Sequence, residues 1–178
     1  IPAKVQTYLA CGKPILAMID GEASRIIDNA QAGLTCPSER PELLAKKIAS
    51  YYSSNIKGLN FSLLGLSFKP NTDDVRDASS LVIIEALLSL GATVRAFDPE
   101  VKSVTQFDSH ASFFMAENAY DAASGANAVM LVTEWNAFRE LDLSHLRSQM
   151  ADGAFFDLRN VYNEEKLAQH NFDYTYII

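Results

Sequence analysis

Short apolar runs alternate with amphipathic stretches along this chain of 178 residues. After residue 57 the apolar runs have the length of buried strands, and the stretches between them repeat apolar residues at helical spacing. We expect strands at residues 60–66, 93–97, 112–115, 128–132, 154–157 and 173–177, and helices at residues 79–90, 120–124, 141–150 and 163–170. Strands that alternate with helices in this way predict an α/β fold in which helices cover both faces of a parallel sheet.

The first 56 residues predict a smaller α/β unit. Its expected helices span residues 2–10, 23–32 and 38–52, and its expected strands span residues 14–19 and 34–36. Two short strands make a thin core, so this unit should need a neighbour to bury its second face.

The charge changes between these two parts. Residues 1–56 carry six Lys/Arg and five Asp/Glu, whereas residues 57–178 carry nine Lys/Arg and seventeen Asp/Glu. The polar stretch at residues 51–58 ends in a glycine and suits a junction. The sequence therefore predicts two domains, residues 1–56 and residues 57–178, with a proteolytically sensitive segment between them.

Composition argues against several classes of function. The net charge is −7 and the pI is about 4.9. A negatively charged protein is not suited to bind nucleic acid without regard to sequence, or to bind an anionic membrane surface. No apolar run reaches the roughly 18 residues that a membrane span needs. The two cysteines, Cys11 and Cys36, are too few for a disulfide framework, and no signal peptide is in view. We therefore expect reduced thiols and a cytoplasmic protein.

Candidate chemistry gathers after three of the expected strands, in the polar segments 68–77, 133–135 and 157–160. The carboxyl ends of parallel strands share one edge of the sheet, where ligands bind. Three cations would reach that edge and suit a diphosphate: Lys69, Arg76 and Arg159. The alternative interpretation is that they are solvated loop charges paired with nearby acidic residues, Asp73, Asp74 and Asp77.

Other chemistry is not indicated by the residue spacing. The segment 65–67 after the strand at 60–66 lacks the Gly-rich spacing of a dinucleotide fingerprint. The three histidines, His110, His145 and His170, have no metal-ligand spacing among themselves or with the cysteines. We therefore assign no catalytic residue and no metal ligand.

Five motifs carry a resemblance to a known family over residues 57–178. They are LGLSFKPNTDDVR at residues 64–76, SLVIIEALL at 80–88, AFDP at 96–99, VTEW at 132–135 and FDLRNVY at 156–162. In these motifs the chain resembles the UDP-binding domain of the UDP-glucose 6-dehydrogenase family, which includes the GDP-mannose dehydrogenases. The resemblance implies a Rossmann-like three-layer domain. It also implies NAD-dependent, two-step oxidation of a sugar C6 hydroxyl to a carboxylate in the synthesis of polysaccharide precursors.

The resemblance also implies roles for individual residues. Phe68 and Lys69 resemble the family's substrate contacts, and Arg159 resembles the arginine that reaches the UDP part of the substrate. Arg76 resembles the arginine directed at the pyrophosphate of the cofactor NAD. The family usually has glycine where this chain has Leu158, so a side chain there is expected to crowd the nucleotide.

The segments that carry the family's chemistry are not in this sequence. They are the NAD-binding domain with its Gly-rich loop and the GSCFPKD motif with its nucleophilic cysteine. The implied thiohemiacetal chemistry needs that cysteine and a bound NAD. We therefore expect UDP or a UDP-sugar as the ligand, no tight binding of NAD and no turnover by this chain alone.

Residues 1–52 resemble a different family. The motifs PAKVQTYLACGKPI at residues 2–15, DGE at 20–22 and AGL at 32–34 are similar to the C-terminal half of GT-B-fold glycosyltransferases. Retaining members commonly have glutamate at the position of Thr7, where it meets the donor ribose. Two other functions therefore stay open: part of a nucleotide-sugar-dependent glycosyltransferase, and a non-catalytic interaction protein. The sugar, the base and a homo-oligomeric state are left undecided.

Overall fold

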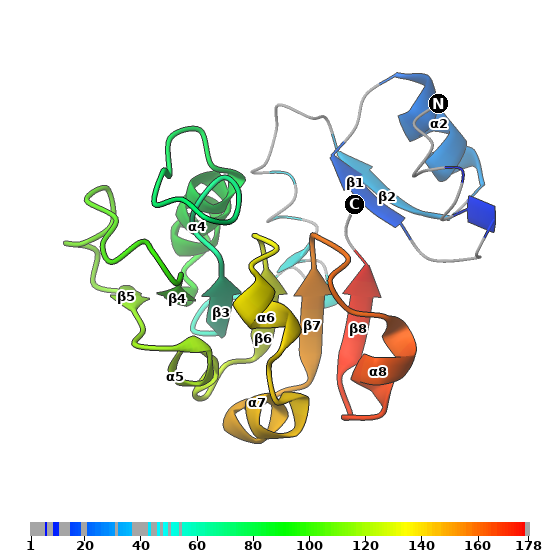
Figure 1. The fold of residues 1–178 in the computed structure, drawn as a ribbon. Helices are drawn as coiled ribbons and strands as arrows, with labels where there is room; N and C mark the ends of the chain where they lie inside the picture. Colours follow the sequence, from blue (N-terminus) through cyan, green and yellow to red (C-terminus); the bar gives the residue numbers. More distant parts are fainter. Residues whose placement is uncertain are drawn as a thin grey trace.

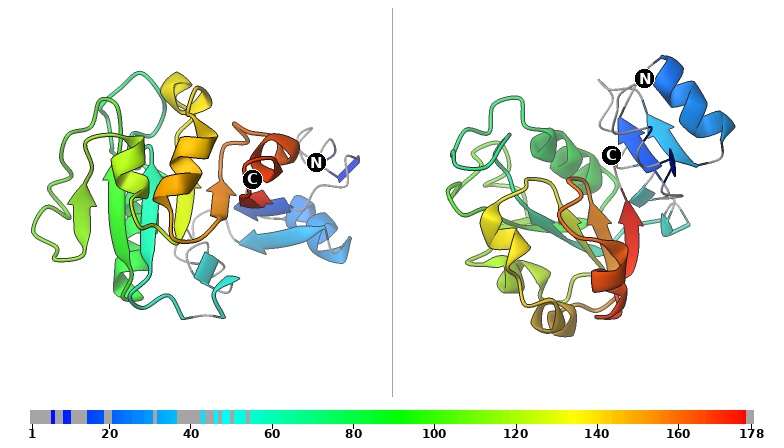
Figure 2. Two further views of the ribbon diagram at one scale, coloured as in Figure 1. Left: turned by 90° about the horizontal axis from the view of Figure 1, so that it is seen from below. Right: turned by 45° about the vertical axis from the view of Figure 1, so that its right-hand side comes forward.

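The computed structural model describes residues 55–176 throughout, and before them residues 6, 9–10, 15–18, 21–30, 32–36, 43, 46, 48–49 and 51–53. In the first part, β1 (Ile15–Met18) and β2 (Gly33–Cys36) form a parallel pair connected through α2 (Glu22–Asn29), which confirms the predicted strand, helix and strand. This unit lies beyond one edge of the larger sheet in every view (Figures 1 and 2). Most residues of the helices predicted at 2–10 and 38–52 lie outside the described residues, and residues 6, 9 and 10, which are described, are helical.

The larger part of the molecule is a parallel sheet of six strands (Figure 1). The strands are β3 (Asn60–Leu64), β4 (Thr93–Phe97), β5 (Phe113–Met115), β6 (Ala128–Leu131), β7 (Ala154–Asp157) and β8 (Asp173–Tyr176). Their order is β5-β4-β3-β6-β7-β8, and each neighbouring pair is parallel. The chain builds outward from β3 to one edge and then returns to build the other half. This is the strand order of doubly wound nucleotide-binding folds, and it confirms the expected Rossmann-like architecture.

Helices cover both faces of this sheet (Figure 2). They are α4 (Ser79–Ser89), α5 (Ala119–Ala123), α6 (Asn136–Arg139), α7 (Leu143–Gln149) and α8 (Glu164–Ala168). The sequence pattern missed α6, because four residues are too few to show a helical period. It also extended the first long strand to residue 66, two residues beyond the end of β3.

Two hydrophobic cores lie on opposite faces of the sheet, because successive strand residues point to opposite sides. Leu63 and Phe156 belong to the core beneath α4, whereas their neighbours Leu64 and Phe155 belong to the core beneath α5, α7 and α8. Both faces of the strands are therefore buried, which explains why β3, β6 and β7 read as almost continuous apolar runs.

Residues before the predicted domain boundary pack into the core beneath α4. Ile48 is 1% exposed and Ile56 is 2% exposed, and both belong to that core. The ring of Tyr52 makes an edge contact with Phe61 of β3, with centroids 5.9 Å apart, and its hydroxyl donates to the carbonyl of Asn127 at 3.0 Å. The boundary between residues 56 and 57 stays a prediction, but hydrophobic contacts cross it.

These contacts predict that residues before position 57 stabilise the larger sheet. Ile48→Ala should lower the free energy of unfolding by about 2–5 kcal/mol, because it removes a fully buried aliphatic side chain. The measurement is urea unfolding followed by the fluorescence of Trp135, the single tryptophan of the chain, which is buried beneath the other face of the sheet. Lys46→Ala, at an exposed position of the same segment, is the control. An unfolding midpoint unchanged by Ile48→Ala would show that the two parts are energetically independent.

Candidate functional site

The candidate site lies where the chain switches direction within the sheet. β3 and β6 are neighbours, but the chain leaves them toward opposite edges, so their carboxyl ends form the switch point at which doubly wound sheets bind ligands. Three segments meet at this edge: residues 65–78 after β3, residues 132–135 after β6 and residues 158–163 after β7. They contain the four residues singled out from the sequence, Phe68, Lys69, Arg76 and Arg159.

A buried carboxylate, that of Asp98, connects these segments. Asp98 follows β4, is 0% exposed and accepts hydrogen bonds with both oxygens. Its Oδ1 accepts from the backbone N–H groups that follow it, and its Oδ2 accepts from residues after β3 and β6. The donors are the N–H groups of Glu100 (2.9 Å), Val101 (3.1 Å), Leu66 (2.8 Å) and Ser67 (3.1 Å), the hydroxyl of Ser67 (3.0 Å) and the indole Nε1 of Trp135 (3.1 Å).

These hydrogen bonds explain why β3 ends early. The N–H groups of Leu66 and Ser67 donate to Asp98 rather than to a neighbouring strand. Burial alone would raise the pKa of Asp98, but the backbone donors stabilise the charged form and hold its pKa below the ordinary value. The carboxylate is therefore ionised although solvent does not reach it.

Asp157, at the end of β7, has a related arrangement with the opposite result. Its Oδ1 accepts from the N–H of Arg159 at 3.0 Å, and its Oδ2 accepts from the N–H of Tyr162 at 2.9 Å. Burial outweighs these donors and raises the pKa of Asp157. The hydrogen bonds close the turn that presents Arg159, a turn in which Asn160 adopts the left-handed conformation at φ 52°.

The segments after β3 and β6 also touch directly. The hydroxyl of Thr133 donates to the carbonyl of Ser67 at 2.7 Å, and the indole Nε1 of Trp135 lies 3.2 Å from the hydroxyl of Ser67. Gly65 permits this approach: it has φ +97°, and a Cβ there would lie 2.5 Å from Cβ of Thr133. Only glycine fits at this position without moving the two segments apart.

Arg159 crosses from the end of β7 to the end of β6. Its Nε donates to the carbonyl of Val132 at 2.7 Å and lies 3.2 Å from Oε2 of Glu134. The side chain is 36% exposed, and within the described part of the chain its two terminal Nη groups have no hydrogen-bond partner. A guanidinium held at Nε with a free fork suits a two-pronged contact with an anion.

Phe68 and Lys69 lie on the exposed side of the segment after β3. The ring of Phe68 is 41% exposed, and Nζ of Lys69 lies 5.2 Å from its centroid. The N–H of Phe68 donates to the carbonyl of Asp74 at 3.1 Å, which folds the segment back on itself. The structure shows no direct contact between Lys69 and Arg159, so the two cations share an edge of the sheet without touching.

Arg76 differs from Arg159 because its carboxylate partner occupies the terminal part of the guanidinium group. Its Nε and Nη2 donate to both oxygens of Asp74, the shortest contact being 2.6 Å, while its side chain is 86% exposed. These hydrogen bonds lower the pKa of Asp74 to about 2. For Arg76 this is the pairing that the alternative interpretation of the loop charges predicts.

Leu158 does not project freely at the edge. It is half-buried and packs against the core beneath α4. Part of its side chain therefore occupies core space, which weakens the expectation that it crowds the nucleotide.

Sequence reasoning missed the residues that hold the site together. Asp98 and Ser67 were not candidates, although each follows a predicted strand, and Thr133 was noted only as part of the polar segment 133–135. The available signal was their position directly after apolar strands, where a buried polar side chain must find hydrogen-bond partners inside the protein. The sequence placed Glu134 and Arg159 at the same edge of the sheet, but their spacing did not show that they form an ion pair.

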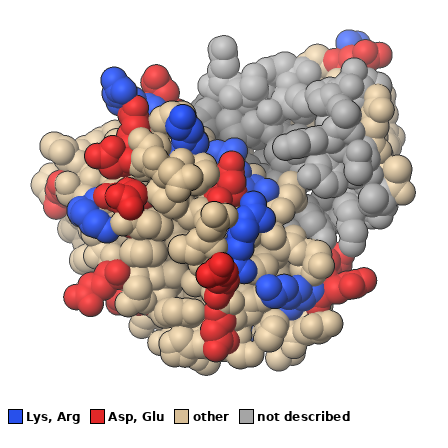
Figure 3. Space-filling model, in the orientation of Figure 1, with Lys and Arg blue, Asp and Glu red and all other residues tan. Residues whose placement is uncertain are grey.

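Charge does not concentrate on the face seen in Figure 3. Blue and red side chains lie interspersed over its described part, in keeping with the net charge of −7. Anion binding at the edge would therefore depend on individual side chains such as Arg159. Among the described residues no group of three His, Cys, Asp or Glu side chains could hold a metal ion.

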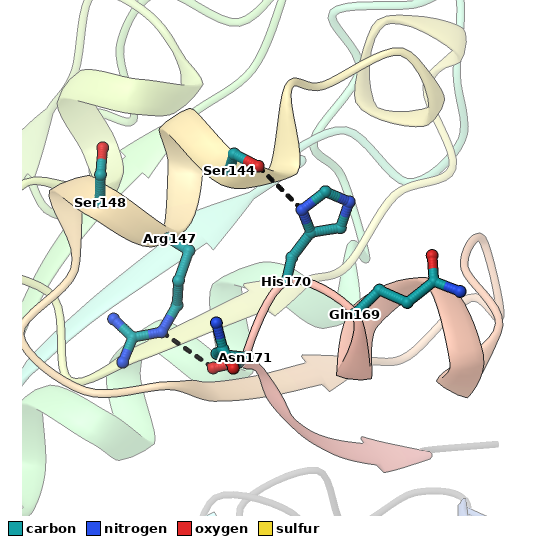
Figure 4. A pocket seen from close by; sticks show the side chains of 6 residues that line it. All are labelled: Ser144, Arg147, Ser148, Gln169, His170 and Asn171. Carbon is teal, nitrogen blue, oxygen red and sulfur yellow. Dashed lines mark hydrogen bonds between the residues drawn. The ribbon is translucent and has the colours of Figure 1, made fainter.

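A surface pocket lies elsewhere, between α7 and the end of α8 (Figure 4). The hydroxyl of Ser144 lies 2.9 Å from Nδ1 of His170, and Nε of Arg147 donates to the carbonyl of Asn171 at 3.0 Å. These residues precede β8, whereas the candidate site follows β3, β6 and β7. None of the residues predicted from the sequence to bind a ligand lines this pocket.

Comparison with known proteins identifies a family. Residues 62–164 match the model of the UDP-glucose/GDP-mannose dehydrogenase family, UDP binding domain. The chain is 37% identical over 143 residues to UDP-glucose 6-dehydrogenase of Rhizobium meliloti, covering 78% of this chain and 31% of the relative. It is 31% identical over 165 residues to the Rickettsia bellii enzyme of the same name, covering 91% of this chain and 38% of the relative. Both matches are longer than the segment after residue 57, so the similarity continues upstream of the predicted boundary.

Solved structures share the fold. A UDP-glucose dehydrogenase from Pyrobaculum islandicum superposes with a TM-score of 0.60 at 22% identity and covers 98% of this chain. An NDP-N-acetyl-D-galactosaminuronic acid dehydrogenase from Methanosarcina mazei superposes with a TM-score of 0.65 at 18% identity and covers 97%. This chain matches only 34% and 35% of those two chains.

The described residues contain no helix long and apolar enough to cross a membrane. The glycosyltransferase resemblance of residues 1–52 stays a prediction, and most of its motif at residues 2–15 lies outside the described residues. The chain spans about a third of the length of the curated relatives that it matches.

The family model covers more than half of the sequence, and the strand order agrees with it. This chain therefore belongs to the UDP-glucose/GDP-mannose dehydrogenase family and corresponds to its UDP-binding domain.

Proposed function

We propose that this chain binds the UDP part of a UDP-sugar at the carboxyl ends of β3, β6 and β7. The observation that carries the proposal is the side chain of Arg159, whose Nε is held by the carbonyl of Val132 beside Glu134, while its terminal Nη groups have no partner among the described residues. A diphosphate oxygen pair matches that fork, and the geometry is formed before the ligand arrives. In the longer protein, the proposed reaction is oxidation of the sugar C6 hydroxyl to a carboxylate.

Two neighbouring side chains would complete the contact. Lys69 brings a second cation to the same edge, and the exposed ring of Phe68 offers an apolar surface beside it. Each cation would contribute roughly 1.5–3 kcal/mol where it is desolvated by the ligand. The remaining contacts of a full site would come from outside this chain. The expected affinity for UDP is therefore weak, in the micromolar to millimolar order of magnitude.

The residues of this chain do not fit a complete site for NAD. β3 is followed by residues 65–78, which lead to α4 without a Gly-rich turn into the helix. Arg76 is the single candidate for a contact with the NAD pyrophosphate, and its guanidinium is already paired with Asp74. NAD supplies the hydride acceptor of such oxidations, and we assign its binding to parts of the longer protein.

A cytoplasmic location and a homo-oligomeric state remain part of the proposal.

The first prediction separates the roles of the arginines. Arg159→Ala should weaken UDP binding about tenfold or more, because it removes a charge-assisted contact. Arg76→Ala should leave UDP affinity nearly unchanged, because that side chain is 86% exposed and paired with Asp74. Calorimetric titration of the chain with UDP measures both.

Arg147→Ala is the matched control for this experiment. Its Nε is anchored by a backbone carbonyl, as in Arg159, but it lies in the pocket between α7 and α8. Equal weakening by Arg147→Ala and Arg159→Ala would argue against the proposed site. So would wild-type chain that shows no UDP binding at millimolar concentration.

The second prediction concerns catalysis. The purified chain mixed with UDP-glucose and NAD should produce no NADH absorbance above a blank, because it spans about a third of its relatives and holds no nucleophilic cysteine motif. Sustained turnover that is lost in Cys11→Ala or Cys36→Ala would show that the chemistry lies within this chain.

A further inference from the structure

We propose that Asp98 is a positioning residue for the UDP site, acting through Ser67 and Trp135 on the residues that meet the ligand. The proposal rests on the proposed function, since it names what shapes that same site. Asp98 itself is 0% exposed, so it would act through its neighbours rather than by touching the ligand.

The carboxylate of Asp98 contacts one residue of the segment after β3 and one residue of the segment after β6. On the β3 side it accepts the N–H and the hydroxyl of Ser67, the residue before Phe68. On the β6 side it accepts the indole N–H of Trp135, the residue after Glu134. Asp98 thus holds the direct sequence neighbours of Phe68 and Glu134, the two residues that lie closer to the proposed ligand position.

Glu134 extends the connection to the third segment. Its Oε2 lies 3.2 Å from Nε of Arg159, which also donates to Val132 of the same segment. A displacement of the segment after β6 would therefore move both anchors of Arg159. In this way one buried group sets the relative positions of side chains that come from β3, β6 and β7.

An ionised carboxylate is the group that these contacts require. Each of its partners donates, so both oxygens must accept, and the donors hold the charged form. Asparagine has the same shape, but its amide would place an N–H against one set of donors. Asp98→Asn is therefore a change of hydrogen bonding at constant volume.

Trp135 makes the arrangement observable. It is the single tryptophan of the chain, so the protein has one indole N–H resonance, and that N–H donates to Asp98 and lies beside Ser67. The resonance reports the hydrogen bond directly and does not depend on whether UDP is present. It therefore separates the state of the contact from the strength of ligand binding.

The test uses the full chain and measures UDP affinity by calorimetry and the indole N–H by NMR. In Asp98→Asn we expect the indole resonance to move and UDP affinity to fall about tenfold or more. Ser67→Ala and Trp135→Phe, which each remove one donor, should weaken UDP binding about threefold. Asp152→Asn is the matched control, because it makes the same change where the carboxylate accepts from Asn127 at the opposite edge of the sheet.

A purely structural role for Asp98 predicts a different result. Leu146→Ala creates a cavity in the core beneath α7 and should lower stability without changing UDP affinity in the folded protein. Folded Asp98→Asn with UDP affinity within twofold of the wild type would overturn the proposal. If Asp98→Asn does not fold, unchanged affinity in both Ser67→Ala and Trp135→Phe would overturn it. Absence of UDP binding by the wild type would instead reject the proposed function, and the indole resonance in Asp98→Asn would still show whether the contact exists.

Discussion

A buried carboxylate must find donors inside the protein, and in this domain that requirement fixes the geometry of the site. Asp98 is 0% exposed, and four backbone N–H groups, a hydroxyl and an indole supply the hydrogen bonds that water would otherwise make. The donors can satisfy it only if the segments after β3 and β6 lie close together. The hydrogen bonds that stabilise the buried charge therefore also fix how the segments after β3 and β6 are placed relative to each other.

Strand order brings the right segments to that place. Because the chain leaves β3 and β6 toward opposite edges, their carboxyl ends form the switch point of the sheet. Gly65 lets the two segments meet, and Arg159 reaches the same space by lying back over Val132 from the end of β7. The fold thus explains why residues far apart in the sequence converge at one edge. The chemistry of a diphosphate then explains why a free guanidinium fork is useful there.

The sequence was sufficient to predict the alternation of strands and helices. Strands that are buried on both faces appear as continuous apolar runs, and helices that are buried on one face show apolar residues at helical spacing. It was insufficient where hydrogen bonds override the pattern. β3 stops at Leu64 because Leu66 and Ser67 donate to Asp98, and apolar character alone cannot reveal that. The thin core of the first unit predicted that it would need a neighbour, but the sequence did not show that residues such as Ile48 would pack into the core beneath α4.

The candidate site shows the same division. Polar residues at strand ends pointed to the correct edge, but their pairing could not be read from spacing. Arg76 and Arg159 look equivalent as loop cations, and each lies beside a carboxylate. Asp74 occupies the terminal Nη2 of Arg76, whereas the terminal Nη groups of Arg159 have no partner in the described part of the chain. Leu158 looks like an obstacle in the sequence, whereas in the structure it packs partly against the core.

The most direct test of this account is the crystal structure of the chain with UDP. We expect the diphosphate within hydrogen-bond distance of the terminal Nη groups of Arg159, with Nε still on the carbonyl of Val132 and the hydrogen bonds of Asp98 unchanged. UDP bound instead between α7 and α8, or bound at the sheet edge without contact to Arg159, would contradict the account.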